Sequence, residues 1–320
     1  MLFVEDEGVN PFVETEPYEV GFANHYETYL KPQVHVFEKR RNQAVQKFKK
    51  NTRRSIIIVA AVVALLYFDI IPWLNGASGA AVVFLVVFSI AISRSSLHEY
   101  RESVKEKVFP HVLSFLGEYS FDPKPGSQMD RFEGSQILPD YHVEKSEDRT
   151  VGTYKGVNIE FFETILQKPK QTVFHGVVIK LSVKKLFKGH TIVARDRGLG
   201  GNFFKKIFSG SLEKASLEDP RFEDTFEVFT TDQVEARYLL TASFMERLLN
   251  LHDVFEGKGV QCSFYEDMLL IMIPSSKNLF EARSIWQRVD FIDDAKAFLK
   301  EMNQIFSVID ILKLDQDTGL

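Results

Sequence analysis

Two long apolar runs separated by a short polar turn dominate the hydropathy pattern of the first hundred residues. The first run spans residues 56–74 and contains one charge, Asp69, whereas the second spans residues 77–93 and contains none. As helices the runs would be about 28 Å and about 26 Å long. Neither run has a polar face, although a helix on the surface of a soluble domain carries one. The pattern therefore predicts a two-helix transmembrane hairpin, with a buried hairpin in a soluble core as the alternative.

The residues between the two runs are typical of a turn at a membrane surface. Pro72 and Trp73 precede Asn75 and Gly76. Proline, asparagine and glycine break helices, and tryptophan favours the membrane–water interface. Asp69 would lie about 8 Å from the end of its span, within reach of interfacial water. We interpret Asp69 as a structural residue of the turn, with an ion or proton site or a buried contact between subunits as the alternative.

Apolar residues at helical spacing continue on both sides of the predicted hairpin. These residues are Tyr26, Leu30, Val34, Phe37, Ala44 and Phe48 before it, and Leu97, Tyr100, Val104, Val108, Val112 and Phe115 after it. We expect the two stripes to pack against each other, so that residues 25–120 form an antiparallel helical stalk that contains the hairpin. Self-association of the stripes between subunits, giving a homo-oligomer, is the alternative.

Beyond a linker at residues 121–150, the pattern changes to that of an α+β domain over residues 151–320. Strands are predicted at residues 151–166, 172–183, 190–196, 226–230, 260–267 and 268–274. Helices are predicted over residues 232–255 and from about Val289 to Leu314. Lys155–Gly156 divides the first strand run into a hairpin, so we expect mainly antiparallel pairing. A small closed barrel capped by the last helix, as in pleckstrin-homology folds, is one such arrangement by analogy alone.

The net charge of −5 conceals a block pattern. Residues 1–20 carry six acids and no base, and we assign residues 1–24 to an acidic tail. Residues 21–54 carry nine bases against two acids, whereas the chain from residue 94 onward carries thirty bases and thirty-five acids. Basic residues next to membrane spans mark the cytoplasmic side. We therefore expect a multi-pass membrane protein with both termini in the cytoplasm, and the acidic large domain argues against nucleic acid as a partner.

One segment of the α+β domain resembles a known family. Residues 217–248, "LEDPRFEDTFEVFTTDQVEARYLLTASFMERL", are similar to the signature of the bacterial membrane-protein family catalogued as domain of unknown function 3137. Residues 172–196 and 278–286 are similar too, so the resemblance covers much of residues 150–290. Ala242 departs from the family pattern, in which proline follows the threonine, and this puts a local turn in doubt. The resemblance implies a bacterial inner-membrane protein and brings no activity, substrate or catalytic residue.

The same segment contains two candidate interaction residues. Arg237 and Arg247 lie among acidic residues, so we expect salt bridges between helix and strand, with a binding site for a peptide or an anionic head group centred on Arg237 as the alternative. Asp232 and Ser243 each precede a glutamate by three residues, which predicts a capping box at the start of two helices. A second set of candidate interaction residues, for contact with a bilayer surface, lies in a glycine-rich loop. It consists of Phe203, Phe204, Lys205 and Lys206.

The sequence contains no motif for catalysis, for a cofactor or for a metal. Its eight histidines form no metal-ligand pair, and the single cysteine, Cys262, lies in a predicted strand. His252–Asp253 is not accompanied by a nucleophile motif. The sequence therefore predicts a membrane-anchored cytoplasmic interaction module that binds a protein or lipid partner at the inner face of a bacterial membrane. An enzyme with an unrecognised active site in the α+β domain is the alternative.

Overall fold

A computed structural model describes residues 10–67, 78–183, 186–195, 212–255, 259–275, 277–282 and 285–314. The chain divides into two compact units. Unit 1 contains residues 1–115 and 281–297, and unit 2 contains residues 116–280 and 298–320. The last helix, α9 (Ile292–Leu312), begins in unit 1 and ends in unit 2.

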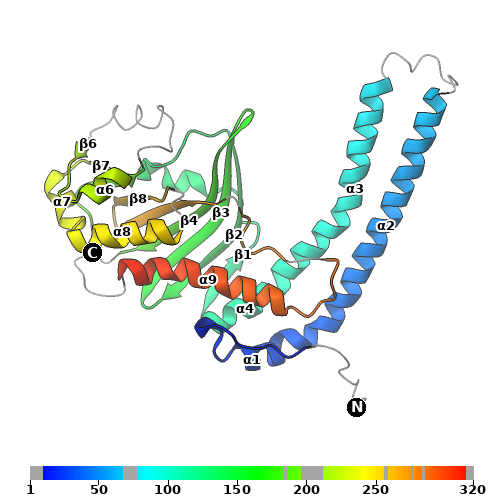
Figure 1. Ribbon diagram of the computed structural model, residues 1–320, viewed down its shortest axis with the longest axis horizontal. Coiled ribbons are helices and arrows are strands. Elements are labelled where there is room, and N and C mark those ends of the chain that lie inside the picture. The colour runs from blue at the N-terminus through cyan, green and yellow to red at the C-terminus, as the bar shows by residue number, and fades with distance from the viewer. Residues whose placement is uncertain are drawn as a thin grey trace. The chain divides into compact units, whose positions relative to one another are not determined.

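Unit 1 is helical. Its elements are η1 (Pro17–Glu19), α1 (Phe22–His25), η2 (Tyr26–Leu30), α2 (Lys31–Tyr67), α3 (Ser78–Lys107) and α4 (Phe109–Leu116). The helices α2 and α3 lie side by side and run in opposite directions (Figure 1). The hydroxyl of Ser96 on α3 donates a hydrogen bond of 3.4 Å to the carbonyl oxygen of Ala44 on α2.

The apolar stripes before and after the predicted hairpin are largely buried in unit 1, from Tyr26 to Ala44 and from Tyr100 to Val112. Part of their partner surface comes from the far end of the sequence. The ring of Phe37 contacts that of Phe291 edge-on at 5.3 Å, and the Tyr26 hydroxyl donates to the carbonyl oxygen of Asp290. The pairing of the two stripes alone does not account for the burial of α2.

The predicted transmembrane hairpin is wrong: in the part of the chain that the structure describes, no helix has a stretch long and apolar enough to cross a membrane. The apolar part of α2 starts at Ile56 and its described portion ends at Tyr67, about 18 Å later, and that of α3 runs about 24 Å before Arg94. Both are shorter than a hydrocarbon core of about 30 Å. The predicted turn, with Asp69, lies outside the described residues.

We use the term arm for residues 48–67 of α2 and residues 78–94 of α3. The arm contains these apolar portions and the basic residues next to them. Large apolar side chains of the arm face solvent, with 67% of Ile57 and 67% of Phe84 exposed. The others that are exposed are Ile56, Ile58, Val63, Val83, Val87, Phe88 and Ile90. A contiguous apolar surface of this kind marks an interaction site.

Unit 2 is a nine-stranded antiparallel sheet in the order β1-β2-β3-β4-β9-β8-β5-β7-β6. The strands are β1 (Tyr119–Asp122), β2 (Val143–Tyr154), β3 (Val157–Lys168), β4 (Gln171–Ser182), β5 (Thr191–Ala194), β6 (Glu213–Ala215), β7 (Glu227–Thr230), β8 (Gln261–Tyr265) and β9 (Met268–Pro274). The predicted mainly antiparallel α+β fold is confirmed. The sheet has two edges, β1 and β6, and so differs from a small closed barrel.

The predicted hairpin at Lys155–Gly156 is present between β2 and β3. Both residues have positive φ, 48° and 81°, as a two-residue type I′ turn requires. Tyr154 pairs with Val157 across this turn. The glycine is therefore used for its backbone freedom.

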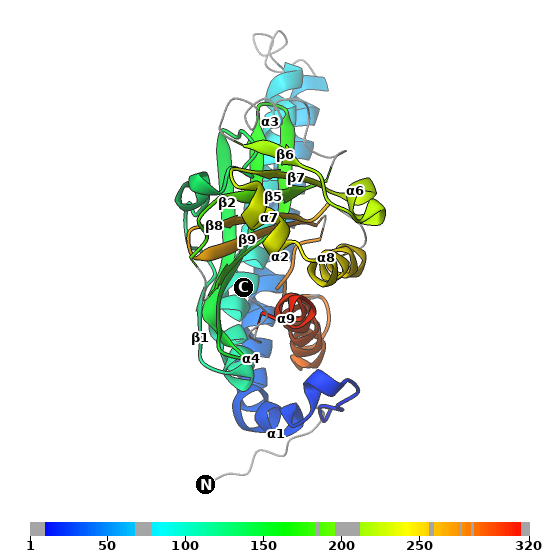
Figure 2. The same ribbon diagram turned by 90° about the vertical axis from the view of Figure 1, so that its left-hand side faces the viewer.

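Helices cover both faces of this sheet. The remaining elements of unit 2 are η4 (Met129–Ser135), α6 (Pro220–Thr225), α7 (Gln233–Leu239), α8 (Ala242–Val254) and α9 from residue 298. Figures 1 and 2 show α8 and α9 on the same face. The ring of Phe280 bridges Phe161 on β3 to Phe298 on α9, while the neighbouring Phe162 stacks on Phe132 of η4. Successive side chains of a strand point to opposite faces, so both faces contribute to the core.

Candidate functional site

An apolar hollow lies on the arm, between α2 and α3. It has a volume of about 600 Å³ and is mostly apolar. Its lining consists of Phe48, Thr52, Ser55, Ile56, Val59, Ala60, Val63, Val86, Ser89, Ile90 and Arg94. We call this hollow the arm groove. Since α2 and α3 each present isoleucine and valine along it, the groove can accept an apolar chain or side chain.

Cations surround the arm where its apolar part begins. We call them the basic collar; they are Lys49, Lys50, Arg53, Arg54 and Arg94, and all are exposed. On the side of the collar away from the apolar part, Lys47 pairs with Glu99 at 3.4 Å. This contact brings α3 beside the basic stretch of α2, so that Arg94 joins the four cations of α2. The arm therefore presents an apolar surface with positive charge along one border.

A second groove, of about 570 Å³, lies in unit 2 beside Arg237. One wall is formed by the segment that leads into α6, with Glu218 and Asp219, and the other by α7 and α8. Arg237 is exposed and has no ion-pair partner among the described residues. We call this the Arg237 groove. The predicted salt bridge between Arg237 and the nearby acids is not formed, and Arg237 is free to bind a ligand.

The other predicted interaction residues have different positions. Arg247 on α8 donates a hydrogen bond to the carbonyl oxygen of Leu312 at the end of α9, which is a structural contact. Glu227, one of the acidic residues that precede these arginines in the sequence, pairs with Lys214 at 2.6 Å. The candidates Phe203, Phe204, Lys205 and Lys206 lie outside the described residues.

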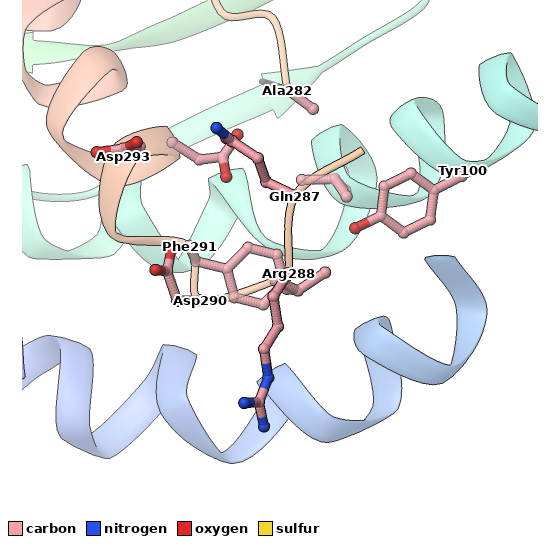
Figure 3. A pocket seen from close by; sticks show the side chains of 10 residues that line it. Tyr100, Ala282, Gln287, Arg288, Asp290, Phe291 and Asp293 are labelled. Atoms are coloured by element: carbon pink, nitrogen blue, oxygen red, sulfur yellow. The ribbon is translucent and has the colours of Figure 1, made fainter. Parts of the chain in front are cut away.

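A smaller pocket in unit 1, of about 260 Å³, lies between α3 and residues 282–294. Tyr100 is 8% exposed, and its hydroxyl points into the pocket (Figure 3). Burial raises the pKa of this hydroxyl, and the charge of Asp294 raises it further. Asp290 accepts a hydrogen bond from the backbone N–H of Ile292, and both Asp293 and Asp294 have partners. The acids around the pocket are thus part of the start of α9.

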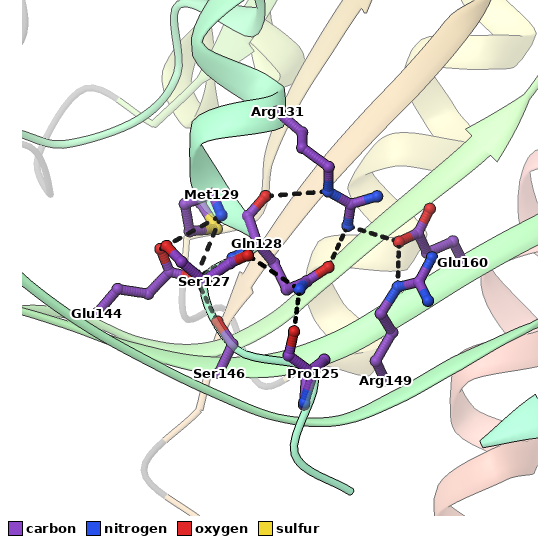
Figure 4. Close-up of polar contacts among 9 residues, drawn as sticks. All are labelled: Pro125, Ser127, Gln128, Met129, Arg131, Glu144, Ser146, Arg149 and Glu160. Atoms are coloured by element: carbon purple, nitrogen blue, oxygen red, sulfur yellow. Dashed lines mark hydrogen bonds and ion pairs between the residues drawn. The ribbon is translucent and has the colours of Figure 1, made fainter. Parts of the chain in front are cut away.

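A polar network joins η4 to β2 and β3 (Figure 4). Glu160 accepts hydrogen bonds of 2.7 Å from Arg131 and from Arg149. Burial alone would raise the pKa of Glu160, but the two guanidinium groups outweigh it and hold the pKa below its usual value. Glu144 accepts from the backbone N–H groups of Gln128 and Met129. These carboxylates are occupied by η4, so we assign the network a structural role.

The buried pair of His190 and Ser263 is the arrangement nearest to a catalytic one. The imidazole Nε2 lies 2.8 Å from the Ser263 hydroxyl, and burial lowers the pKa of His190. However, the Ser263 side chain is fully buried and its hydroxyl donates to the carbonyl oxygen of Ser135. A substrate cannot reach this hydroxyl. Within the described ranges no group of three or more His, Cys, Asp or Glu side chains is arranged to hold a metal ion.

The arm groove was not predicted from the sequence as a binding site, because both apolar runs were assigned to the interior of a bilayer. The signal was nevertheless present: the apolar run starting at Ile56 directly follows the basic stretch that ends at Arg54. The Arg237 groove was predicted only as an alternative. Its second wall is formed by residues 216–220, which lie beside α7 and α8 only in the folded chain. The spacing of residues in the sequence does not reveal this proximity.

Comparisons with known proteins bear on the family of this chain. A family model described as "Protein of unknown function (DUF3137)" matches residues 172–314, so the predicted family is confirmed over that range, whereas its predicted membrane location is not. No curated protein matches the sequence. Among solved structures, the chain is similar to the "crystal structure of the mycobacterial trehalose monomycolate transport factor A, TtfA", with 13% identity and a TM-score of 0.36. That similarity covers 66% of this chain and 97% of the other.

Proposed function

We propose that this chain, which belongs through residues 172–314 to the DUF3137 family of proteins of unknown function, is an interaction module that binds anionic lipid through its arm. The observation that carries the proposal is the exposed apolar surface of the arm with the basic collar at its border. Acyl chains would occupy the apolar surface and the arm groove, and phosphate groups would contact the collar. The proposal concerns the surface of the arm and needs no membrane-spanning helix.

The charge of the basic collar favours lipid over a second copy of the chain. Two arms aligned in parallel would bring two collars together, and like charges repel. Anionic head groups instead neutralise the collar, with about 1 kcal/mol for each lysine or arginine near a charged lipid surface. The apolar surface adds about 25 cal/mol for each Å² removed from water. The two contributions act together because the collar and the apolar surface adjoin on the same two helices.

The inner face of a bacterial cytoplasmic membrane offers both acyl chains and anionic phosphates. We propose it as the place where the arm acts. The lipid class then follows from the collar: head groups with net negative charge should bind better than zwitterionic ones.

Sedimentation of the full chain with vesicles tests the proposed function. We expect binding to vesicles of phosphatidylcholine and phosphatidylglycerol in equal parts, weaker binding to phosphatidylcholine alone, and a loss of affinity as salt is added. The double change Arg53→Glu and Arg54→Glu should weaken binding at least about tenfold, since removing about 2 kcal/mol already exceeds that factor. Phe84→Glu should also weaken it, because Phe84 is one of the most exposed apolar residues of the arm.

Matched controls lie outside the arm. Leu186→Glu replaces another exposed apolar residue by an acid, and Lys300→Glu reverses another exposed cation; both should bind vesicles like the unmodified chain. Equal binding by the arm variants and the controls would contradict the proposal. So would a chain that ignores vesicles and associates with itself through the arm, which would make the arm a contact between subunits.

A further inference from the structure

The helix α7 has a solvent-exposed face. Arg237 and Tyr238 lie three and four residues after Val234, so both are neighbours of Val234 on the surface of the helix. Val234 is 76% exposed and Tyr238 75% exposed, whereas Ala236 and Leu239 on the opposite face are buried. Exposed tyrosine and arginine beside an apolar residue are the residue types that carry most of the affinity in protein–protein interfaces.

The Arg237 groove adjoins this face and combines apolar and polar walls. Leu217, Leu240 and Met245 supply its apolar part, and Leu240 and Met245 are otherwise buried. The two acids of the opposite wall are Glu218 and Asp219. Asp219 is occupied as the N-cap of α6, where its carboxylate accepts from the N–H groups of Arg221 and Phe222. The groove can thus hold an apolar side chain close to one available cation.

The carboxylates nearest to Arg237 in the sequence are used elsewhere. Asp232 is the N-cap of α7 and accepts from the N–H groups of Val234 and Glu235. Glu235 itself accepts from the backbone N–H groups of Lys188 and Gly189, at 3.0 Å and 2.5 Å. Among the described residues, Arg237 therefore forms no ion pair with a carboxylate.

We propose that the Arg237 groove binds a segment of a partner protein in which an aspartate or glutamate stands beside a large apolar side chain. Arg237 receives the carboxylate, since a guanidinium binds a carboxylate through two parallel hydrogen bonds. The apolar side chain enters between Leu217, Leu240 and Met245. A phosphate group fits less well, because its double negative charge would face Glu218 and Asp219 on the opposite wall.

This proposal is independent of lipid binding by the arm, because every residue that carries it belongs to unit 2. The two proposals therefore fail separately. Arg237→Glu leaves the basic collar intact and should not alter vesicle binding, while Arg53→Glu with Arg54→Glu should not alter peptide binding.

Selection from a displayed library of random peptides, on the immobilised full chain, tests the inference. The unmodified chain should enrich peptides with Asp or Glu next to Leu, Ile, Phe or Met. Arg237→Glu should lose those peptides, and Lys300→Glu, a reversal of an exposed cation on α9, should keep them. One enriched peptide, titrated by fluorescence anisotropy, should bind at least about tenfold more weakly to Arg237→Ala, the effect of losing one charge-assisted hydrogen-bonded contact.

Substitutions at Arg237 should not change the stability of the chain, since Arg237 is exposed and has no ion-pair partner among the described residues. The circular dichroism melts of the three variants should match that of the unmodified chain. The proposal is overturned if no peptide is enriched, if the enriched peptides lack an acid, or if they bind Arg237→Glu equally well. Arg237-dependent binding of phosphatidylglycerol vesicles without peptide binding would overturn it in favour of a lipid head group.

Discussion

Single glutamates connect irregular segments to regular elements throughout this chain. Each of them accepts a hydrogen bond from a backbone N–H group that is distant in the sequence. The pairs are Glu38 with Val289, Glu144 with Gln128 and Met129, Glu163 with Leu279, Glu235 with Lys188 and Gly189, and Glu301 with Phe280. A buried N–H group without a partner is costly, so each glutamate stabilises a segment that has no ladder or helix partners of its own.

Glu38 is the clearest case, and it predicts how the stability of unit 1 depends on pH. Hydrogen bonds from Arg41, reinforced by the N–H of Val289, lower the pKa of Glu38 from 4.5 to about 2. A carboxyl whose pKa is lowered by folding stabilises the fold above its unfolded pKa. This stabilisation is lost as the pH falls from about 4.5 toward 2. We expect Glu38→Gln to lower the free energy of unfolding by about 1–2 kcal/mol at pH 7.

Denaturant unfolding at pH 7 and at pH 3 measures this effect. The difference between Glu38→Gln and the unmodified chain should shrink at pH 3, because the Glu38 carboxyl is then protonated in the unfolded chain and part of the stabilisation by the folded carboxylate is lost. Glu27→Gln is the control: it removes an exposed pair with Lys31, which should contribute less than about 0.5 kcal/mol. A Glu38→Gln effect that is equal at both pH values would show that the charge of Glu38 is not the cause.

At the scale of helices and strands, the starts of helices show how neighbouring signals compete. The sequence predicted capping boxes at Asp232 and at Ser243. Asp232 does cap α7, but Glu235 turns to the backbone of Lys188 and Gly189 and does not complete the box. The cap of α8 is Thr241, two residues before the predicted one, and its hydroxyl accepts from the N–H of Phe244. A hydroxyl two residues inside the helix cannot take this role.

Alanine substitutions distinguish the two assignments of the α8 cap. Thr241→Ala should lower the free energy of unfolding by about 1 kcal/mol, the usual effect of losing a threonine N-cap. Ser243→Ala should change it by less than about 0.5 kcal/mol, since Ser243 is exposed within the first turn. Thermal unfolding of both variants gives the comparison. A larger effect at Ser243 than at Thr241 would return the cap to the position that the sequence predicted.

For the molecule as a whole, the two units are interleaved in sequence. Residues 281–297 belong to unit 1, although the chain on either side of them belongs to unit 2. Within unit 1 this segment is held by α2: Val289 donates its N–H to Glu38, and Arg41 donates to the carbonyl oxygen of Ile285. The predicted division at residue 151 is untested as a boundary and stays a prediction.

The interleaving predicts the behaviour of a truncated chain of residues 116–320. It retains all of unit 2, so it should show the circular dichroism of mixed helix and strand and a cooperative unfolding transition. Residues 285–291, deprived of Glu38 and Arg41, should become mobile. Trypsin should then cut after Arg288 much faster than in the full chain. An unfolded truncated chain, or equal cleavage rates in the two, would contradict this division into units.

The sequence by itself determined the types of the elements in unit 2 and the β2–β3 hairpin, because the periodicity of side chains and the turn at Lys155–Gly156 are local. It also determined the family, through residues 217–248. The transmembrane hairpin predicted from hydropathy is wrong, since within the described residues no helix is long and apolar enough to cross a membrane. The exposed surface of the arm and the basic collar could be recognised only once α2 and α3 were placed side by side.

Tertiary structure alone decided which distant segments meet. In the strand order β4-β9-β8-β5, the pairing of β4 with β9 and that of β8 with β5 join distant parts of the chain. The two walls of the Arg237 groove likewise come from separate segments. The same holds for the glutamates, each of which accepts a hydrogen bond from a backbone N–H group distant in the sequence. The periodicity of apolar residues indicates which side of a helix or strand is buried. It does not indicate which other element packs against that side. That choice depends on long-range contacts whose free energies are realised only when the whole chain has folded.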